Sequence, residues 1–218
     1  MKKLQIKRLS RLPEVPQEVG RMMDAAGIAW ERYDHVNWAE RYPSDTVVNF
    51  RIAHTGDHIL LEYHVENDEL RAEARVDGGK VWEDACCEFF IFDETTHLYN
   101  NIECNCIGTL LMAVGPERNN REMLSSDEMR LVRRWASVND KTVAKSREPQ
   151  SWRLSLIIPV SLLFDRRLTD ISGMSCGANF YKCGDLLPHP HFLSWNPVET
   201  PNPDFHRPDF FGQVIFES

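Results

Sequence analysis

Two glutamates placed among apolar strand residues are the side chains of this sequence best suited to chemistry. In the segment CCEFFIFD, alternation along a strand puts Glu88 on the same face as Cys86 and Phe90, where a carboxylate is costly unless it is hydrogen-bonded. In the next apolar segment, Glu103 and Asn105 lie opposite an apolar face and form a polar ladder. The ladder predicts either a solvated sheet face or a shallow binding platform whose amides and carboxylates would match sugar hydroxyls.

The same two carboxylates also suit glycoside hydrolysis. Glu88 and Glu103 would then flank the scissile bond, with their carboxyl groups about 5–5.5 Å or 6.5–9.5 Å apart across an open cleft. Paired strand carboxylates occur in binding clefts as well, and the sequence does not contain this distance. Catalysis is therefore an alternative to non-catalytic binding.

The proline-rich segment 179–212 carries a second group of candidate binding residues. Its prolines exclude a helix, so the segment predicts a long, ordered loop that leads into a final strand. It contains Asn179, Trp195 and several other aromatic residues, and ordered loops of this composition commonly recognise a ligand. Trp82 stands beside charged turn residues, where an indole either anchors its loop or is presented for stacking.

Three histidines near the end of the chain offer a metal site as another alternative. His189 and His191 would lie on one side of an extended segment, with His206 and either Asp185 or Asp204 as further ligands. Histidines that are hydrogen-bonded within a proline-rich loop are the simpler interpretation. The sequence therefore assigns no metal ligand.

Composition limits the classes of protein that this chain can belong to. Its 218 residues carry a net charge of −8, which argues against nucleic acid as a partner, and no apolar run approaches the roughly 20 residues that cross a bilayer. The basic first residues are not followed by the apolar stretch of a secretory signal, so we expect a cytoplasmic protein; removal of a leader would make it periplasmic or secreted. The six cysteines lack zinc-ribbon and C-x-x-C spacings and are expected to be reduced and buried, with one disulfide between neighbouring strands as an alternative.

Alternating apolar residues predict about ten short strands and few helices. Strands are expected at residues 3–9 (an edge strand), 46–54, 59–65, 69–76, 86–92, 98–107, 108–114, 152–158, 177–183 and 212–216, and helical turns at 16–26, 126–133 and 160–164. No linker or internal repeat divides the chain, so residues 1–218 are expected to form one domain. The pattern predicts an all-β fold: a two-sheet antiparallel β-sandwich, jelly-roll-like, with a few short helices.

The order of several motifs resembles carbohydrate-binding module family 9. The segment VWEDACCEFFIFDE resembles the family's W-x-D-D signature with its following glutamate, and LYNNIECNCIGTLL resembles the next strand. WRLSLIIPVSLL resembles the W-x-x-E-x-x-I-P strand, and the chain closes with Trp195 and then with Phe211 and Gly212. The resemblance runs from near Asn37 to the end of the chain and is closest to a free-standing subgroup of the family.

This resemblance implies a β-sandwich that binds a sugar between two tryptophans, here Trp82 and Trp195. The residues it implies for hydrogen bonds to sugar hydroxyls are Glu88, Glu103, Asn105 and Asn179. The sequence has Ala85 where a second aspartate is common and Ser155 where a glutamate is frequent, which leaves the identity of the sugar open. Some relatives hold structural calcium, but no acidic loop of this chain is assigned to it, so no cofactor is expected.

We therefore expect a non-catalytic carbohydrate-binding domain, with glycan catabolism as its setting. The alternatives are a glycoside-processing enzyme and an interaction module whose aromatic loop docks on a partner protein. A narrow concave slot would favour a sugar, whereas a flat exposed aromatic patch would favour a protein. The sugar hypothesis also requires the two indole rings to meet across a cleft.

Overall fold

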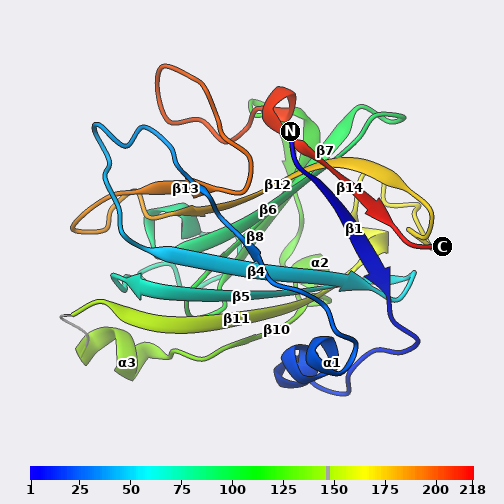
Figure 1. Cartoon of the computed structure of the whole chain (residues 1–218), viewed down its shortest axis with the longest axis horizontal. Coiled ribbons are helices and arrows are strands. Elements are labelled where there is room, and N and C mark those ends of the chain that lie inside the picture. Colours follow the sequence, from blue (N-terminus) through cyan, green and yellow to red (C-terminus); the bar gives the residue numbers. More distant parts are fainter. Residues whose placement is uncertain (146–147) are drawn as a thin grey trace.

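The computed structural model describes residues 1–145 and 148–218 and shows a β-sandwich with a few short helices (Figure 1). Its strands are β1 (Lys3–Arg8), β2 (Glu31–Arg32), β3 (His35–Val36), β4 (Val47–His54), β5 (His58–Asp68), β6 (Cys86–Asp93), β7 (Leu98–Asn105), β8 (Leu110–Glu117), β9 (Asn120–Met123), β10 (Arg133–Ala136), β11 (Gln150–Pro159), β12 (Ser175–Cys183), β13 (Phe192–Ser194) and β14 (Gly212–Phe216). Its α-helices are α1 (Val19–Ala25), α2 (Ser126–Met129) and α3 (Asp140–Lys145), and its 3-10 turns are η1 (Pro16–Glu18), η2 (Val81–Glu83), η3 (Val160–Leu162) and η4 (Pro208–Phe210).

The strands form two layers that are joined through the first strand of the chain. One layer runs β10-β11-β5-β4, and the other runs β14-β12-β6-β7-β8-β9, with β13 beside β12. Strand β1 pairs with β14 near its start and with β4 near its end, and both pairings are parallel. The sandwich is therefore mixed, which corrects the purely antiparallel prediction, and β1 lies between two strands instead of at an edge.

Aromatic residues from both layers meet in the core of the sandwich. Phe180 on β12 stacks on Phe50 of β4, with ring centroids 3.8 Å apart, and on Phe89 of β6, at 4.9 Å. All three side chains are fully buried. Burial of a phenylalanine side chain contributes about 1.5–3 kcal/mol, so these contacts hold the layers together and fix which face of β6 and β12 points inward.

Most predicted strands are present, but the one at residues 69–76 is wrong. That segment belongs to no ladder, and a side chain takes two of its backbone donors. The buried carboxylate of Asp84 accepts the N–H groups of Glu73 and Ala74, each at 3.0 Å, and pairs with Arg71. The segment keeps its alternating apolar residues without joining a sheet.

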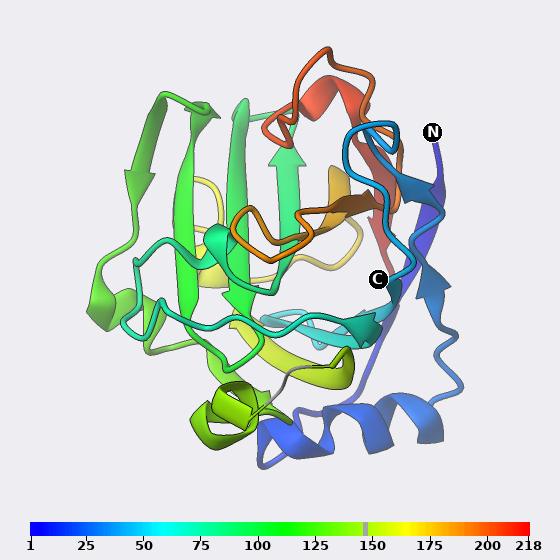
Figure 2. The ribbon, with the colours of Figure 1, turned by 90° about the vertical axis from the view of Figure 1, so that its left-hand side faces the viewer.

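The helical turn predicted at residues 16–26 is present as η1 and α1. Helix α1 places Val19 and Met23 on Ala53, Leu60 and Ile157 of the first layer. Figure 2 shows this helix beneath that layer, with the strands of the second layer side by side. In the described residues, no helix has both the length and the apolar character needed to cross a bilayer.

Candidate functional site

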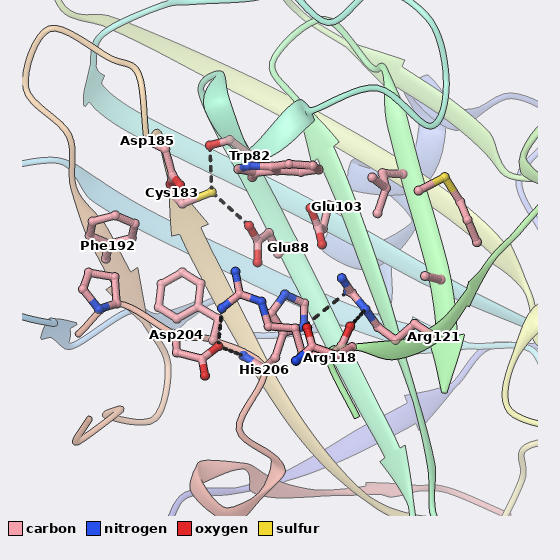
Figure 3. A pocket seen from close by; sticks show the side chains of 16 residues that line it. Trp82, Glu88, Glu103, Arg118, Arg121, Cys183, Asp185, Phe192, Asp204 and His206 are labelled. Carbon is pink, nitrogen blue, oxygen red and sulfur yellow. Dashed lines mark hydrogen bonds and ion pairs between the residues drawn. The ribbon is translucent and has the colours of Figure 1, made fainter. Parts of the chain in front are cut away.

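A pocket of about 280 Å³ lies on the second layer, on the sheet face that points away from the main core (Figure 3). Alternation along β6 creates this face, because Cys87, Phe89 and Ile91 enter the main core while Glu88 and Phe90 point to the other side. The pocket is lined by Trp82, Glu88, Glu103, Leu111, Ala113, Arg118, Asn119, Arg121, Met123, Cys183, Asp185, Phe192, Pro203, Asp204, Phe205 and His206.

Three segments that are far apart in the sequence form the walls of the pocket. The turn η2 brings in Trp82, the β8–β9 hairpin brings in Arg118 and Arg121, and the loop before η4 brings in His206. Figure 3 shows Trp82 on one side of the two glutamates, and the arginines and His206 on the other side. The sheet thus supplies the floor, and the loops supply an aromatic wall and a cationic wall.

The two glutamates of the floor are buried neighbours. Glu88 on β6 is directly opposite Glu103 on β7, and each is 4% exposed. The thiol of Cys183 donates to Glu88 Oε1 at 2.9 Å, and Asn101 Nδ2 donates to Glu103 Oε1 at 2.8 Å. Burial raises the pKa of Glu88 well above its usual value and raises the pKa of Glu103 to about 7. Near neutral pH the pair therefore offers both a donor and acceptors to a ligand.

A short hydrogen-bond chain organises the cationic wall. Arg118 pairs with Asp204 at 3.2 Å, while Arg121 Nη1 and the Tyr99 hydroxyl lie 3.3 and 3.1 Å from His206 Nδ1. Burial, with Arg121 and Arg118 nearby, lowers the pKa of His206 to about 3, so the ring is neutral at physiological pH. Because two donors face Nδ1, the ring proton is assigned to Nε2.

The structure brings together only three of the six residues predicted to bind sugar. Trp82, Glu88 and Glu103 line the pocket. Asn105 and Asn179 instead make hydrogen bonds within the protein, and Trp195 lies in the main core. Asn105 Nδ2 donates to Ala74 O and to an Asp84 oxygen, and its Oδ1 accepts from Thr109 N. Both side chains are fully buried and shape loops.

Trp195 does not face Trp82 across the pocket, which corrects the predicted stacking pair. Its ring is 0% exposed and belongs to the main core, where it meets Phe50 and Phe180 edge-to-face. Asn179 closes the loop behind it by exchanging two hydrogen bonds with the backbone of Asn196, and Trp195 Nε1 donates to Glu31 at 3.2 Å. No face of the indole is free to stack on a sugar.

The three histidines considered as metal ligands go to different partners. His189 contacts Glu69 at 2.7 Å, and His191 lies 3.0 Å from Lys182 Nζ. His206 belongs to the cationic wall, and no metal-ligand cluster of histidines occurs among the described residues. All six cysteines are buried and free, as the sequence predicts.

Sequence reasoning missed Arg118 and Arg121, and it considered His206 only as a metal ligand and not as part of this pocket. The sequence feature that could have indicated the two arginines is the polar, charged stretch that begins at residue 116. A charged hairpin tip is usually solvated, and nothing in the sequence shows that it meets the loop at 203–206. That meeting depends on the order of the strands in the second layer.

The fold and the site together define a class of protein: a β-sandwich with a concave pocket on the outer face of one of its sheets. The chain belongs to carbohydrate-binding family 9, whose sequence model matches residues 17–216. No curated protein matches the chain.

Solved structures repeat this architecture. A candidate carbohydrate-binding protein from Bacteroides uniformis ATCC 8492 is 42% identical, with a TM-score of 0.88 and 99% of each chain covered. Family 9 modules from Caldicellulosiruptor kristjanssonii in complex with cellotriose and with glucose are 11% and 12% identical, with TM-scores of 0.62 and 0.58. The alignments cover 99% of this chain and 94% and 96% of those modules, a likeness that concerns the fold.

The raised pKa of Glu103 predicts a defined pH dependence of stability. Between its ordinary value of 4.5 and about 7, the native state holds a proton that the unfolded chain has lost, so the free energy of unfolding falls as pH rises. The variant Glu103→Gln has no proton to lose at this position, and its amide oxygen can still accept the hydrogen bond from Asn101. The free energy of unfolding of the variant, measured with urea, should therefore rise relative to that of wild type by on the order of 1 kcal/mol or more between pH 4.5 and pH 7.5. Parallel pH profiles of the two proteins would contradict this assignment.

Proposed function

We propose that the pocket binds one end of a carbohydrate, stacked on Trp82 and hydrogen-bonded by Glu88 and Glu103. The observation that carries the proposal is a partly exposed indole beside two buried carboxyl groups in one concave site. An aromatic face suits the C–H side of a pyranose, and paired donors and acceptors suit its hydroxyls. Arg118 and Arg121 add donors from the opposite wall.

The shape of the site supports a small ligand over a protein partner. Phe192 and Phe205 line the pocket but are each only 8% exposed, so they offer no flat apolar patch. The pocket volume of about 280 Å³ lies just below the range of about 300–1,000 Å³ that is usual for small-molecule sites, so it suits a small ligand. Glucose and cellotriose, the ligands of the similar modules, are the first sugars to test.

The position of the two carboxyl groups supports binding over hydrolysis. Glycoside hydrolysis needs one carboxyl group on each side of the scissile bond. Glu88 and Glu103 are cross-strand neighbours on the same pocket floor. Both would meet a sugar from the same side, which suits hydrogen bonding.

The proposal predicts that Trp82→Ala weakens sugar binding while the protein stays folded. Aromatic stacking contributes about 0.5–1.5 kcal/mol beyond the area it buries, so we expect a loss of affinity of about tenfold or more. Isothermal titration calorimetry with glucose and cello-oligosaccharides measures the change. Trp30→Ala is the matched control, because Trp30 is partly exposed, lies under Arg51 and does not line the pocket. If Trp82→Ala and Trp30→Ala bind the sugar with equal affinity, the pocket is not the sugar-binding site.

A further inference from the structure

Two thiols and a carboxyl group converge at the edge of the pocket floor. Cys86 and Glu88 lie on β6 and Cys183 on β12, and one ligand atom of each lies within 4.8 Å of the other two. We propose that Cys86, Glu88 and Cys183 form a binding site for a thiophilic divalent metal ion, with Zn²⁺ as the expected occupant. The metal site uses two thiols that take no part in the proposed sugar contacts, and it shares only Glu88 with them.

The strand register builds this group of ligands. Cys183 is directly opposite Cys86 in the antiparallel pair of β6 and β12, which brings their Cβ atoms to about 4.5–5.5 Å. Glu88 follows two residues after Cys86, so its side chain points to the same face. The cross-strand pair of Cys86 and Cys183 and the two-residue spacing of Cys86 and Glu88 therefore hold all three metal-ligand atoms on strands, without a flexible loop.

The donor set matches zinc more closely than calcium or magnesium. Thiolates are soft ligands that select Zn²⁺ and related ions, whereas Ca²⁺ and Mg²⁺ require oxygen donors. Zinc is commonly held by four ligands in a tetrahedron, and sites with three protein ligands keep one position for water or another small ligand. Glu88 and Cys183 line the pocket, which provides a path for the ion and space for that fourth ligand.

Charges of both signs surround the cluster: Glu103 and Asp185 line the same pocket, and Arg118 and Arg121 form its opposite wall. In residues 1–145 and 148–218, neither Glu88 nor its neighbour Glu103 forms an ion pair. The buried ammonium group of Lys182 is next in sequence to Cys183, but it is engaged by Asp68, His191 and the Cys183 carbonyl. A divalent ion would supply positive charge to this face, and its binding would displace the two thiol protons and a proton of Glu88 if the carboxyl group carries one.

A cobalt and zinc titration tests the site. The full chain is purified under reducing conditions, stripped with a chelator, and titrated with Co²⁺ and then Zn²⁺. We expect one ion per chain, a cobalt–thiolate charge-transfer absorption in the near ultraviolet that Zn²⁺ abolishes, and slower alkylation of Cys86 and Cys183 when zinc is present. Peptide mass spectrometry identifies the protected thiols.

Variants separate this site from other metal ligands. Cys86→Ser and Cys183→Ser should each abolish the cobalt–thiolate band, and Glu88→Gln should weaken binding by at least about tenfold, the loss that even an outer-shell partner can produce. Cys176→Ser is the matched control, because Cys176 is also a buried free cysteine of β12 but is outside the cluster. It should bind the ion as wild type does.

Three results would overturn the proposal. The first is an absence of thiolate-bound cobalt in the wild-type protein. The second is binding that persists in both serine variants, which would point to surface groups such as His189. The third is a Cys86–Cys183 disulfide that forms in preference to metal binding under reducing conditions. If the serine variants fail to fold, the spectrum and the alkylation pattern of the wild-type protein still decide the question. Sugar binding without metal binding would reject this site alone.

Discussion

Replacement of Trp195 by alanine is expected to lower the free energy of unfolding by about 3–5 kcal/mol, the usual cost of truncating a large buried aromatic residue. The indole is fully buried, meets Phe50 and Phe180 with centroids 6.1 and 5.6 Å away, and donates a hydrogen bond to Glu31. Its loss would leave a cavity between the two layers. Urea unfolding, followed by circular dichroism, measures the change.

The paired control is Trp82→Ala, because Trp82 is partly exposed at the pocket. That variant should lose sugar affinity and stay within about 1 kcal/mol of wild type in stability. The two tryptophans would thereby separate into a structural residue and a binding residue. A Trp195→Ala protein with wild-type stability and no sugar binding would reverse these roles and restore the stacking pair that the sequence suggests.

The fold was largely predictable because strand alternation is a local property. Residues of β4, β6, β7 and β12 alternate between two environments, so their strand state and their inward faces follow from the sequence. The segment 69–76 alternates too, but two of its backbone donors, at Glu73 and Ala74, go to Asp84. The parallel pairings of β1 also escaped prediction, since pairing partners are set by tertiary contacts and not by the pattern of one strand.

The candidate site was predictable where a strand face determined it and, for Trp82 on the turn η2, where the family resemblance pointed to it. Glu88 and Glu103 lie where alternation places them, opposite each other on one face. Asn105 and Asn179 were placed in the site because an amide suits a hydroxyl, yet backbone groups of this chain satisfy them. An amide that holds a loop and an amide that binds a ligand look the same in a sequence, and only their hydrogen-bond partners in the folded chain distinguish them.

The second large effect is expected at Lys182, which is fully buried with Asp68. Its Nζ lies 3.2 Å from Asp68 Oδ1 and 3.0 Å from His191 Nε2, and Trp152 Nε1 donates to the other Asp68 oxygen at 2.8 Å. Lys182→Met would leave the Asp68 carboxylate buried without its cation. Breaking a buried ion pair in this way costs about 3–5 kcal/mol, which urea unfolding would measure.

A double-mutant cycle shows whether this cost comes from the pair. Asp68→Asn with Lys182→Met should be less destabilising than the sum of the two single changes, because neither charge remains unpaired. Lys80→Met is the matched control: Lys80 pairs with Glu83 at an exposed surface site, and its loss should cost no more than about 1 kcal/mol. Strict additivity would show that the ammonium and carboxylate groups act independently. Coupling would show that the Lys182–Asp68 pair itself joins β12 of the second layer to the end of β5 in the first layer, beside the pocket.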